Sequence, residues 1–352
     1  MKKIIRRAGI TLLVICMSAI LMVIALFFNE IRTLATLKKV DDHPMYQMRY
    51  YGDYGFDEFL KVGVKSNSDI EDFITKRLLK GLPINLGVIG DGCTAFVTRN
   101  EKGEVIFGRN FDFTYAPSLQ LITEPRNGYK SISTVNLTYA GYTEENLPKG
   151  FSIDSFLTLA APYLPFDGMN EKGLVIALLA VPEAKPAYSS SKVTLNITTA
   201  VRLILDKAAN VDEAVELLKQ YNIYFSGGIK CHYLIADAEG NSVLVEFWDG
   251  ELKVVTVPEN YQIASNFVAY NGLNIGYGYD EFDRYNRVKS AIEENNGILT
   301  EEQAIELLSE IGIYDDNGEN KLQWSVIYNM NNLEWKIFTE RNKNKLISFQ
   351  LK

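Results

Sequence analysis

A cysteine, an arginine and an aspartate stand close together in the stretch whose residue types could do chemistry. Cys93 opens an apolar, β-branched run to Thr98, a second such run ends at Phe107, and the Asn-Glu-Lys-Gly between them is turn-forming sequence. The pattern predicts a β-hairpin that returns Arg109 and Asp112 to the side of Cys93. A nearby guanidinium favours the thiolate, which is the nucleophilic form of cysteine. Cys93 is therefore a candidate nucleophile, with Arg109 lowering its pKa and Asp112 orienting an amine or balancing the guanidinium.

These residues taken alone have a second interpretation. The same residues would also fit a non-catalytic cysteine at a strand edge beside a surface ion pair. For a single cysteine with Arg-x-x-Asp, this non-catalytic arrangement is the more common of the two. Polar residues further along are equally open. Asn170 lies in a Gly-rich turn sequence, and Arg284 and Arg287 stand at the start of a predicted helix, where arginines are usually exposed.

The elements that must position these residues are visible as periodic segments. Residues 174–180 predict a strand buried on both faces, residues 232–257 a β-meander that begins at His232, and residues 323–338 a hairpin. We interpret His232 as a structural hydrogen-bond donor. Helices are predicted at 68–80 with Ser68 or Asp69 as cap, 199–209, 211–220 with Asp212 as cap, 283–294, and 300–311 with Thr300 as cap.

Composition and charge exclude several classes of function. The 352 residues carry a net charge of −8, and basic residues cluster only within residues 2–7, which argues against a nucleic-acid partner. Two histidines and three separated cysteines match no metal-ligand spacing, so we expect no metal and no other cofactor. Cys93 and Cys231 are expected to be free, because a disulfide between them would remove the nucleophile. The sequence leaves the formation of a homo-oligomer open.

The N-terminus predicts a membrane anchor. Four basic residues precede an uncharged apolar run over residues 9–28, which is long enough to span a bilayer. The positive flank, residues 1–8, should stay in the cytoplasm. We therefore expect a single-pass protein of the cell membrane with its main domain on the extracytoplasmic side. A cleaved signal peptide is the alternative.

Two motifs carry a family resemblance. Cys-Thr-Ala at Cys93 with Gly-Arg-Asn-x-Asp at 108–112, and Asp-Gly-x-Asn-Glu-Lys-Gly-Leu at 167–174, resemble the choloylglycine hydrolase and penicillin V acylase family of linear amide C–N hydrolases. The wider group includes acid ceramidase-like and isopenicillin acyltransferase-like enzymes. The resemblance implies an α+β fold of four αββα layers over residues 93–352, of the N-terminal nucleophile hydrolase type. It also implies a precursor that cuts itself before Cys93, so that residues 29–92 are a linker or propeptide; a small extension packed on the main domain is the alternative.

The resemblance also assigns further active-site residues. It implies that Asn170 supplies an oxyanion donor, that Asn266 is a second active-site amide, and that an arginine near position 284 completes the site. Arg284 matches the family pattern of arginine followed by an aromatic residue better than Arg287 does.

These residues together predict a mechanism for cleaving an N-acyl amide of small molecular size. The freed α-amine of Cys93 can act as the general base, since an α-amino pKa near 8 is close to operating pH. The thiolate then forms a thioester that water resolves. An acceptor amine in place of water would make the protein an acyltransferase, and a catalytically inactive, membrane-anchored binding protein is the alternative of another class.

Overall fold

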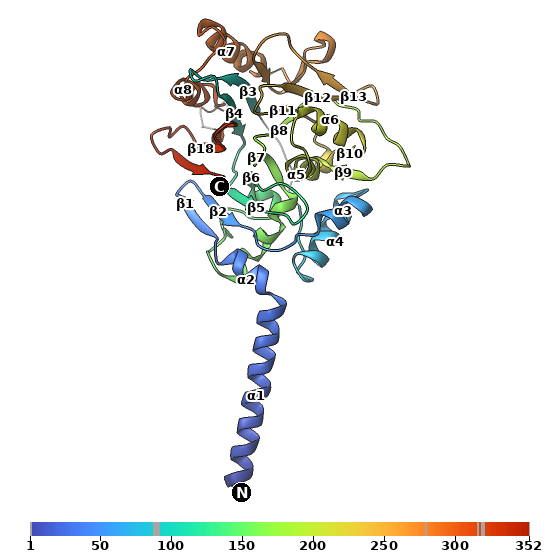
Figure 1. Cartoon of the computed structure of the whole chain (residues 1–352), viewed down its shortest axis with the longest axis vertical. Coiled ribbons are helices and arrows are strands. Elements are labelled where there is room, and N and C mark those ends of the chain that lie inside the picture. Colours follow the sequence, from blue (N-terminus) through green and yellow to red (C-terminus); the bar gives the residue numbers. More distant parts are fainter. Residues whose placement is uncertain (1, 87–91, 279, 315–316, 318–320, 352) are drawn as a thin grey trace.

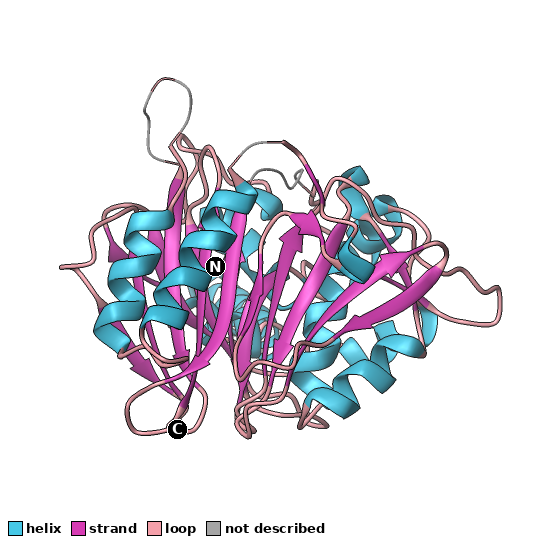
Figure 2. Ribbon diagram, turned by 90° about the horizontal axis from the view of Figure 1, so that it is seen from above, coloured by secondary structure: helices cyan, strands magenta, loops and turns pink. Residues whose placement is uncertain are grey.

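The computed structural model describes residues 2–86, 92–278, 280–314, 317 and 321–351 (Figure 1). Two β-sheets are stacked face to face, and helices lie on their outer sides. Figure 2 shows the strands in the middle of the body with the helices around them. The predicted α+β class is therefore confirmed.

The larger sheet carries much of the core. Among the described residues, its strands in spatial order are β1 (Lys38–Asp41), β2 (Met45–Arg49), β5 (Ser118–Thr123), β6 (Ser131–Asn136), β7 (Pro165–Asn170), β8 (Val175–Ala180), β11 (Cys231–Ala236), β12 (Ser242–Trp248) and β13 (Glu251–Val255). The pair β2 and β5 is parallel, whereas β7, β8, β11 and β12 pair antiparallel. β8 is buried along its whole length, because helix α5 (Ile197–Lys207) covers one face and the smaller sheet the other.

The smaller sheet contains the predicted hairpin. Its strands in spatial order are β14 (Gln262–Ala264), β3 (Cys93–Arg99), β4 (Val105–Asp112), β17 (Leu322–Asn329), β18 (Glu334–Thr339) and β19 (Ile347–Gln350). In the hairpin of β3 and β4, Cys93 lies opposite Phe111. The side chain of Asn100 closes the turn by accepting the backbone N–H groups of Lys102 and Glu104. The two sheets are linked by Trp335, whose indole N–H donates to Gln120 across the interface at 3.2 Å.

Four helices cover the outer faces of the sheets. The larger sheet is covered by α5 (Ile197–Lys207) and α6 (Val211–Lys219), and the smaller sheet by α7 (Glu281–Glu294) and α8 (Glu301–Ile311). The predicted cap of α6 is wrong: Asn210, not Asp212, accepts the N–H of Glu213, at 2.9 Å. Thr300 caps α8 as predicted. Short elements complete the fold: η1 (Leu137–Ala140), η2 (Ile153–Tyr163), β9 (Thr194–Asn196), β10 (Asn222–Tyr224), η3 (Ser226–Gly228), β15 (Phe267–Val268), η4 (Tyr270–Gly272) and β16 (Ile275–Gly276).

The segment before Cys93 is built into this fold. It supplies β1 and β2 to the edge of the larger sheet, together with α3 (Phe56–Val62) and α4 (Asn67–Arg77). The phenyl rings of Phe56 and Phe59 pack against Tyr163 of η2 at 5.8 and 5.2 Å between ring centroids. The cap of α4 is Ser66, two residues before Ser68 and three before Asp69, the predicted caps, and it forms a capping box with Asp69.

The N-terminal helix α1 (Lys2–Leu26) projects from the body and is followed by α2 (Phe28–Leu34) (Figure 1). Within the described residues, no single helix meets the length and hydropathy required to cross a membrane. Ile10–Leu26 and Phe28–Leu34 meet the requirement only as a pair, and they are bent by 69°. The predicted transmembrane helix over residues 9–28 is therefore not supported.

Candidate active site

Cys93 is held from several directions at the start of β3. Its side chain is buried, and its backbone N–H donates to Oδ1 of Asn266 at 2.7 Å. Its sulfur lies 3.7 Å from Nη2 of Arg109, which can donate to it. Its carbonyl oxygen accepts from Nη1 of Arg284 at 2.7 Å. Strands β3 and β4, helix α7 and the link between β14 and β15, which carries Asn266, thus converge on one residue.

Arg109 reaches Cys93 from inside the interface between the sheets. Its side chain is completely buried, and Nη2 also donates to the carbonyl of Leu178 at 2.8 Å. Nη1 forms an ion pair with Asp167 on β7. The other carboxylate oxygen of Asp167 accepts from the hydroxyl of Tyr328 at 2.6 Å. Sequence reasoning missed both Asp167 and Tyr328.

The electrostatic balance at the sulfur favours the thiol in the uncleaved chain. Burial raises the pKa of Cys93 above its usual value, and the guanidinium groups of Arg109 and Arg284 oppose that rise without reversing it. The expectation that Arg109 lowers the thiol pKa is correct in sign, but desolvation outweighs it. A proton acceptor is therefore needed before the sulfur can attack.

Asn266 and Arg284 form the other side of the site. Nη2 of Arg284 donates to Oδ1 of Asn266 at 3.0 Å, and Nδ2 of Asn266 donates to the carbonyl of Ala180 at 2.8 Å. Arg284 also contacts the hydroxyl of Thr94. The structure places Arg287 elsewhere, on the exposed side of α7 near Glu310. Of the two candidate arginines, Arg284 is the one that touches Cys93.

Asp112 lies beside the peptide bond that precedes Cys93. Its backbone N–H donates to the carbonyl of Gly92 at 2.9 Å, and its own carbonyl accepts the Gly92 N–H at 3.1 Å. Oδ1 accepts the backbone N–H of Ile313 at 2.8 Å, while the buried Oδ2 has no hydrogen-bond partner among the described residues. Burial raises the pKa of Asp112 to about 6, against the lowering effect of Arg284.

Gly92 stands in a position with little room for a side chain. A Cβ atom built on it would lie 2.1 Å from Cδ1 of Ile313 and 3.4 Å from Cβ of Asp112. Any larger residue there would have to displace the isoleucine. The position before Cys93 therefore accommodates only glycine without a shift of its neighbours.

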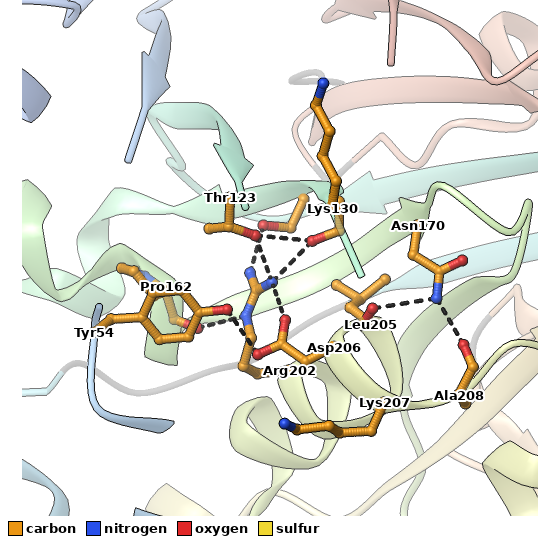
Figure 3. A network of polar contacts seen from close by, with 12 residues as sticks. Tyr54, Thr123, Lys130, Pro162, Asn170, Arg202, Leu205, Asp206, Lys207 and Ala208 are labelled. Carbon is orange, nitrogen blue, oxygen red and sulfur yellow. Dashed lines mark hydrogen bonds and ion pairs between the residues drawn. The ribbon is translucent and has the colours of Figure 1, made fainter. Parts of the chain in front are cut away.

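Asn170 does not belong to this group of contacts. Its Nδ2 donates to the carbonyls of Leu205 and Ala208 at the end of α5, at 3.1 and 2.7 Å (Figure 3). Its Oδ1 accepts the N–H groups of Lys172 and Leu174 in the turn after β7. These contacts use both amide hydrogens of Asn170 to fasten a turn to a helix, and none of them reaches Cys93. The oxyanion role that the resemblance implies for Asn170 is not tested by them and stays a prediction.

Comparison with known proteins places the chain in a family. Residues 93–295, more than half of the chain, match the family described as linear amide C-N hydrolases, choloylglycine hydrolase family. The chain belongs to this family. A penicillin V acylase of Pectobacterium atrosepticum is 33% identical over 111 residues, which are 28% of this chain and 29% of that protein. The chain thus matches less than a third of the length of this curated relative.

Solved structures agree on the fold of the choloylglycine hydrolase family. A variant of conjugated bile acid hydrolase from Clostridium perfringens superimposes with a TM-score of 0.54 at 18% identity, covering 73% of this chain and 92% of that one. A second variant of the same hydrolase gives 0.53 at 18% identity, covering 74% and 92%. These likenesses show the N-terminal nucleophile hydrolase fold.

The remaining cysteine and histidine of the main domain, Cys231 and His232, are both buried. Cys93 and Cys231 are both free and buried. His232 lies within 3.0 Å of Glu246 through Nδ1, and Glu246 also accepts the N–H groups of Ala269 and Tyr270. In the described part of the chain, no cluster of three or more histidine, cysteine or acidic side chains could hold a metal ion.

Proposed function

We propose that the protein is a cysteine amidohydrolase that cleaves the linear amide bond of an N-acyl compound through a thioester, after cutting its own Gly92–Cys93 bond. One observation carries the proposal. The backbone nitrogen, the carbonyl oxygen and the sulfur of Cys93 are each held by a different polar side chain. A structural cysteine at a strand start needs none of these contacts, whereas a nucleophile that becomes an N-terminus needs all three.

The first step is the cleavage of the precursor. The sulfur of Cys93 attacks the carbonyl carbon of Gly92, a C–S bond forms, the C–N bond breaks, and the thiol proton passes to the released amine. Water then hydrolyses the thioester and leaves a carboxylate on Gly92. The N–H of Asp112, 2.9 Å from the Gly92 carbonyl oxygen, is placed to stabilise the negative charge that develops on it.

The second step uses the new amine as the base. An α-amine with a pKa near 8 can accept the Cys93 proton at neutral pH. Oδ1 of Asn266 already accepts from this nitrogen, and the unpaired Oδ2 of Asp112 gives a second acceptor for its additional hydrogens. The thiolate then attacks the acyl carbonyl of the substrate.

The remaining residues stabilise the intermediate and complete the turnover. Nδ2 of Asn266 is the side-chain amide at the site that can donate to the oxyanion, in exchange for the Ala180 carbonyl that it now contacts. The leaving amine takes the proton held by the α-amine, and water enters to hydrolyse the acyl thioester. Arg284 holds Asn266 and the Cys93 carbonyl in place throughout.

The substrate class follows from the family. Relatives are named penicillin V acylase and conjugated bile acid hydrolase, and the family is described as linear amide C-N hydrolases. We propose that this chain takes an N-acyl amide of small size. Penicillin V, bile acid conjugates, N-acyl amino acids, acyl homoserine lactones and N-acyl lipids form the panel of compounds to be tried.

We further propose that the segment before the cut stays bound after cleavage. Strand β2 pairs along its length with β5. The hydroxyl of Tyr54 donates to buried Asp206 at 2.6 Å, and Asp206 is in turn paired with Arg202 (Figure 3). Release would expose this ion pair and the apolar side chains that pack on Tyr163. The propeptide would then be a second chain of the active enzyme.

The proposed location is the cell membrane, with the catalytic domain outside the cytoplasm. The support is the uncharged run over residues 9–28 with basic residues before it. Carbonate extraction of membranes, followed by protease treatment of intact cells, tests this. Release by carbonate of the chain that carries residues 9–28, or a catalytic domain that is protected from protease in intact cells, would contradict the proposed location.

The activity is tested with purified protein and the variants Cys93→Ala and Cys93→Ser. The wild-type chain should release an amine from at least one compound of the panel, and Cys93→Ala should release none. Cys93→Ser should retain a small fraction of the activity, because its hydroxyl is a weaker nucleophile. Equal turnover by wild type and Cys93→Ala would overturn the proposal.

A further inference from the structure

A second carboxylate and a tyrosine stand behind the arginine of the site. Asp167 and Tyr328 are completely buried, and they come from β7 of the larger sheet and β17 of the smaller sheet. The tyrosine hydroxyl donates to one oxygen of Asp167, and the other oxygen pairs with Arg109. Neither side chain is among those that contact Cys93. They lie behind Arg109, which does contact the sulfur.

The geometry of the guanidinium gives Asp167 a defined task. Arg109 directs Nη2 at the Cys93 sulfur and at the Leu178 carbonyl, and Nη1 at Asp167. Its Nε has no hydrogen-bond partner among the described residues. Asp167 is therefore the anionic group that fixes the orientation of the Arg109 guanidinium, because a planar guanidinium is oriented by its charged partner.

We propose that Asp167 and Tyr328 are a positioning pair, which holds Arg109 against the Cys93 sulfur and offsets its charge so that the thiol keeps its proton until a base accepts it. The inference rests on the proposed role of Cys93 as nucleophile. Asp167 then determines whether the Cys93 sulfur is a thiol or a thiolate, and Tyr328 orients the Asp167 carboxylate.

Burial is the main reason why an arginine at 3.7 Å does not produce a thiolate, and the pairing of Arg109 with Asp167 weakens the field of the arginine further. A buried ion pair acts on a third group nearly as a dipole, whose field falls off faster than that of a single charge. Replacing Asp167 by asparagine leaves a full positive charge beside the sulfur. At a pH below the thiol midpoint, the thiolate fraction of Cys93 should then rise by about tenfold or more, since one pKa unit is tenfold.

The two variants are expected to differ in direction. Asp167→Asn should increase the thiolate fraction. Tyr328→Phe keeps the carboxylate and its charge, so the thiolate fraction should stay equal to that of the wild type or fall. A purely structural role predicts a different outcome, because loosening the core would expose Cys93 to reagent in both variants alike.

The test is the rate of alkylation of Cys93 by iodoacetamide in the full chain between pH 6 and 10, read at the Cys93 peptide by mass spectrometry. Tyr139→Phe is the matched control, since Tyr139 is also buried and its hydroxyl is bonded to Ser226 instead of to the site. The proposal expects a lower midpoint pH and about tenfold faster alkylation at pH 7 for Asp167→Asn only. No amide substrate is required, so the result is independent of whether the hydrolase proposal holds.

Two results would overturn the positioning role. One is a midpoint in Asp167→Asn that is equal to or higher than that of the wild type. The other is a midpoint that falls equally in Tyr328→Phe. If Asp167→Asn does not fold, Tyr328→Phe alone decides: a midpoint at or above that of the wild type supports the pair, and a lower midpoint contradicts it.

Discussion

Asp112 should destabilise the uncleaved chain, and removing its charge should make that chain more stable at neutral pH. Burial raises the pKa of this carboxyl from 3.8 to about 6. A rise of that size corresponds to about 3 kcal/mol of folding free energy lost when the group is ionised in both states. Asp112→Asn should recover up to about this amount.

The pH dependence gives the sign of the effect. Above pH 6 the carboxyl is ionised in both the folded and the unfolded chain, so the full penalty of about 3 kcal/mol applies. Between pH 6 and 4 the folded chain takes up a proton before the unfolded chain does, and the penalty shrinks. Near pH 4 and below, it vanishes. The stability advantage of Asp112→Asn should therefore be largest at pH 7 to 8 and should disappear by about pH 4.

The measurement is denaturant unfolding from pH 4 to 8 in a Cys93→Ala background, where no cleavage can occur. Asp72→Asn, which removes an exposed aspartate of α4, is the control and should change stability by less than about 0.5 kcal/mol at any pH. A constant offset between Asp112→Asn and its parent would reflect the new amide group alone. An advantage that does not decline towards pH 4, or a loss of stability at pH 7, would refute the reasoning.

Three further predictions concern cleavage and assembly. Gly92→Ala should slow precursor cleavage by at least about tenfold because its methyl group meets Ile313, and Ile313→Ala in the same chain should restore the rate; no rescue would mean that the contact is irrelevant. Arg284→Lys should slow cleavage strongly, since a lysine ammonium cannot hold the Cys93 carbonyl and Asn266 together as the planar guanidinium does, whereas Arg287→Lys should leave cleavage unchanged. Equal effects of the two substitutions would contradict the assignment of Arg284 to the site. The two cleaved chains should co-elute in gel filtration and separate only in denaturant, and spontaneous release of the smaller chain would refute retention. Tyr54→Phe should lower the stability of the two-chain complex by about 1–3 kcal/mol, so that less denaturant is required to separate the chains.

Local sequence signals were sufficient to place the nucleophile and its nearest partners. The hairpin of β3 and β4 depends on two β-branched runs and a four-residue turn, so its register follows from contacts that are close in sequence. That register puts Arg109 and Asp112 beside Cys93. The placement of Arg284 could also be read from periodicity, because Arg284, Val288 and Ile292 form one buried stripe of α7, whereas Arg287 lies outside it.

Contacts between distant elements could not be read in this way. The pairing of Arg109 with Asp167 exists only because the two sheets are stacked, and nothing within either strand signals it. The side chain of Asn170 contacts the end of α5, where it donates to the carbonyl of Leu205, 35 residues further along the chain. The parallel pairing of β2 with β5 likewise joins segments that no local pattern connects, so the sequence left open whether the segment before Cys93 is a linker or propeptide or a small extension packed on the main domain.

The most direct test of the central claim is the intact mass of purified wild-type protein and of Cys93→Ala, with N-terminal sequencing of the larger product. We expect a product that begins at Cys93 in the wild type, together with the smaller chain that ends at Gly92, and an uncleaved Cys93→Ala protein. A wild-type chain that hydrolyses an N-acyl amide without being cleaved, or cleavage at the same bond in Cys93→Ala, would contradict this expectation.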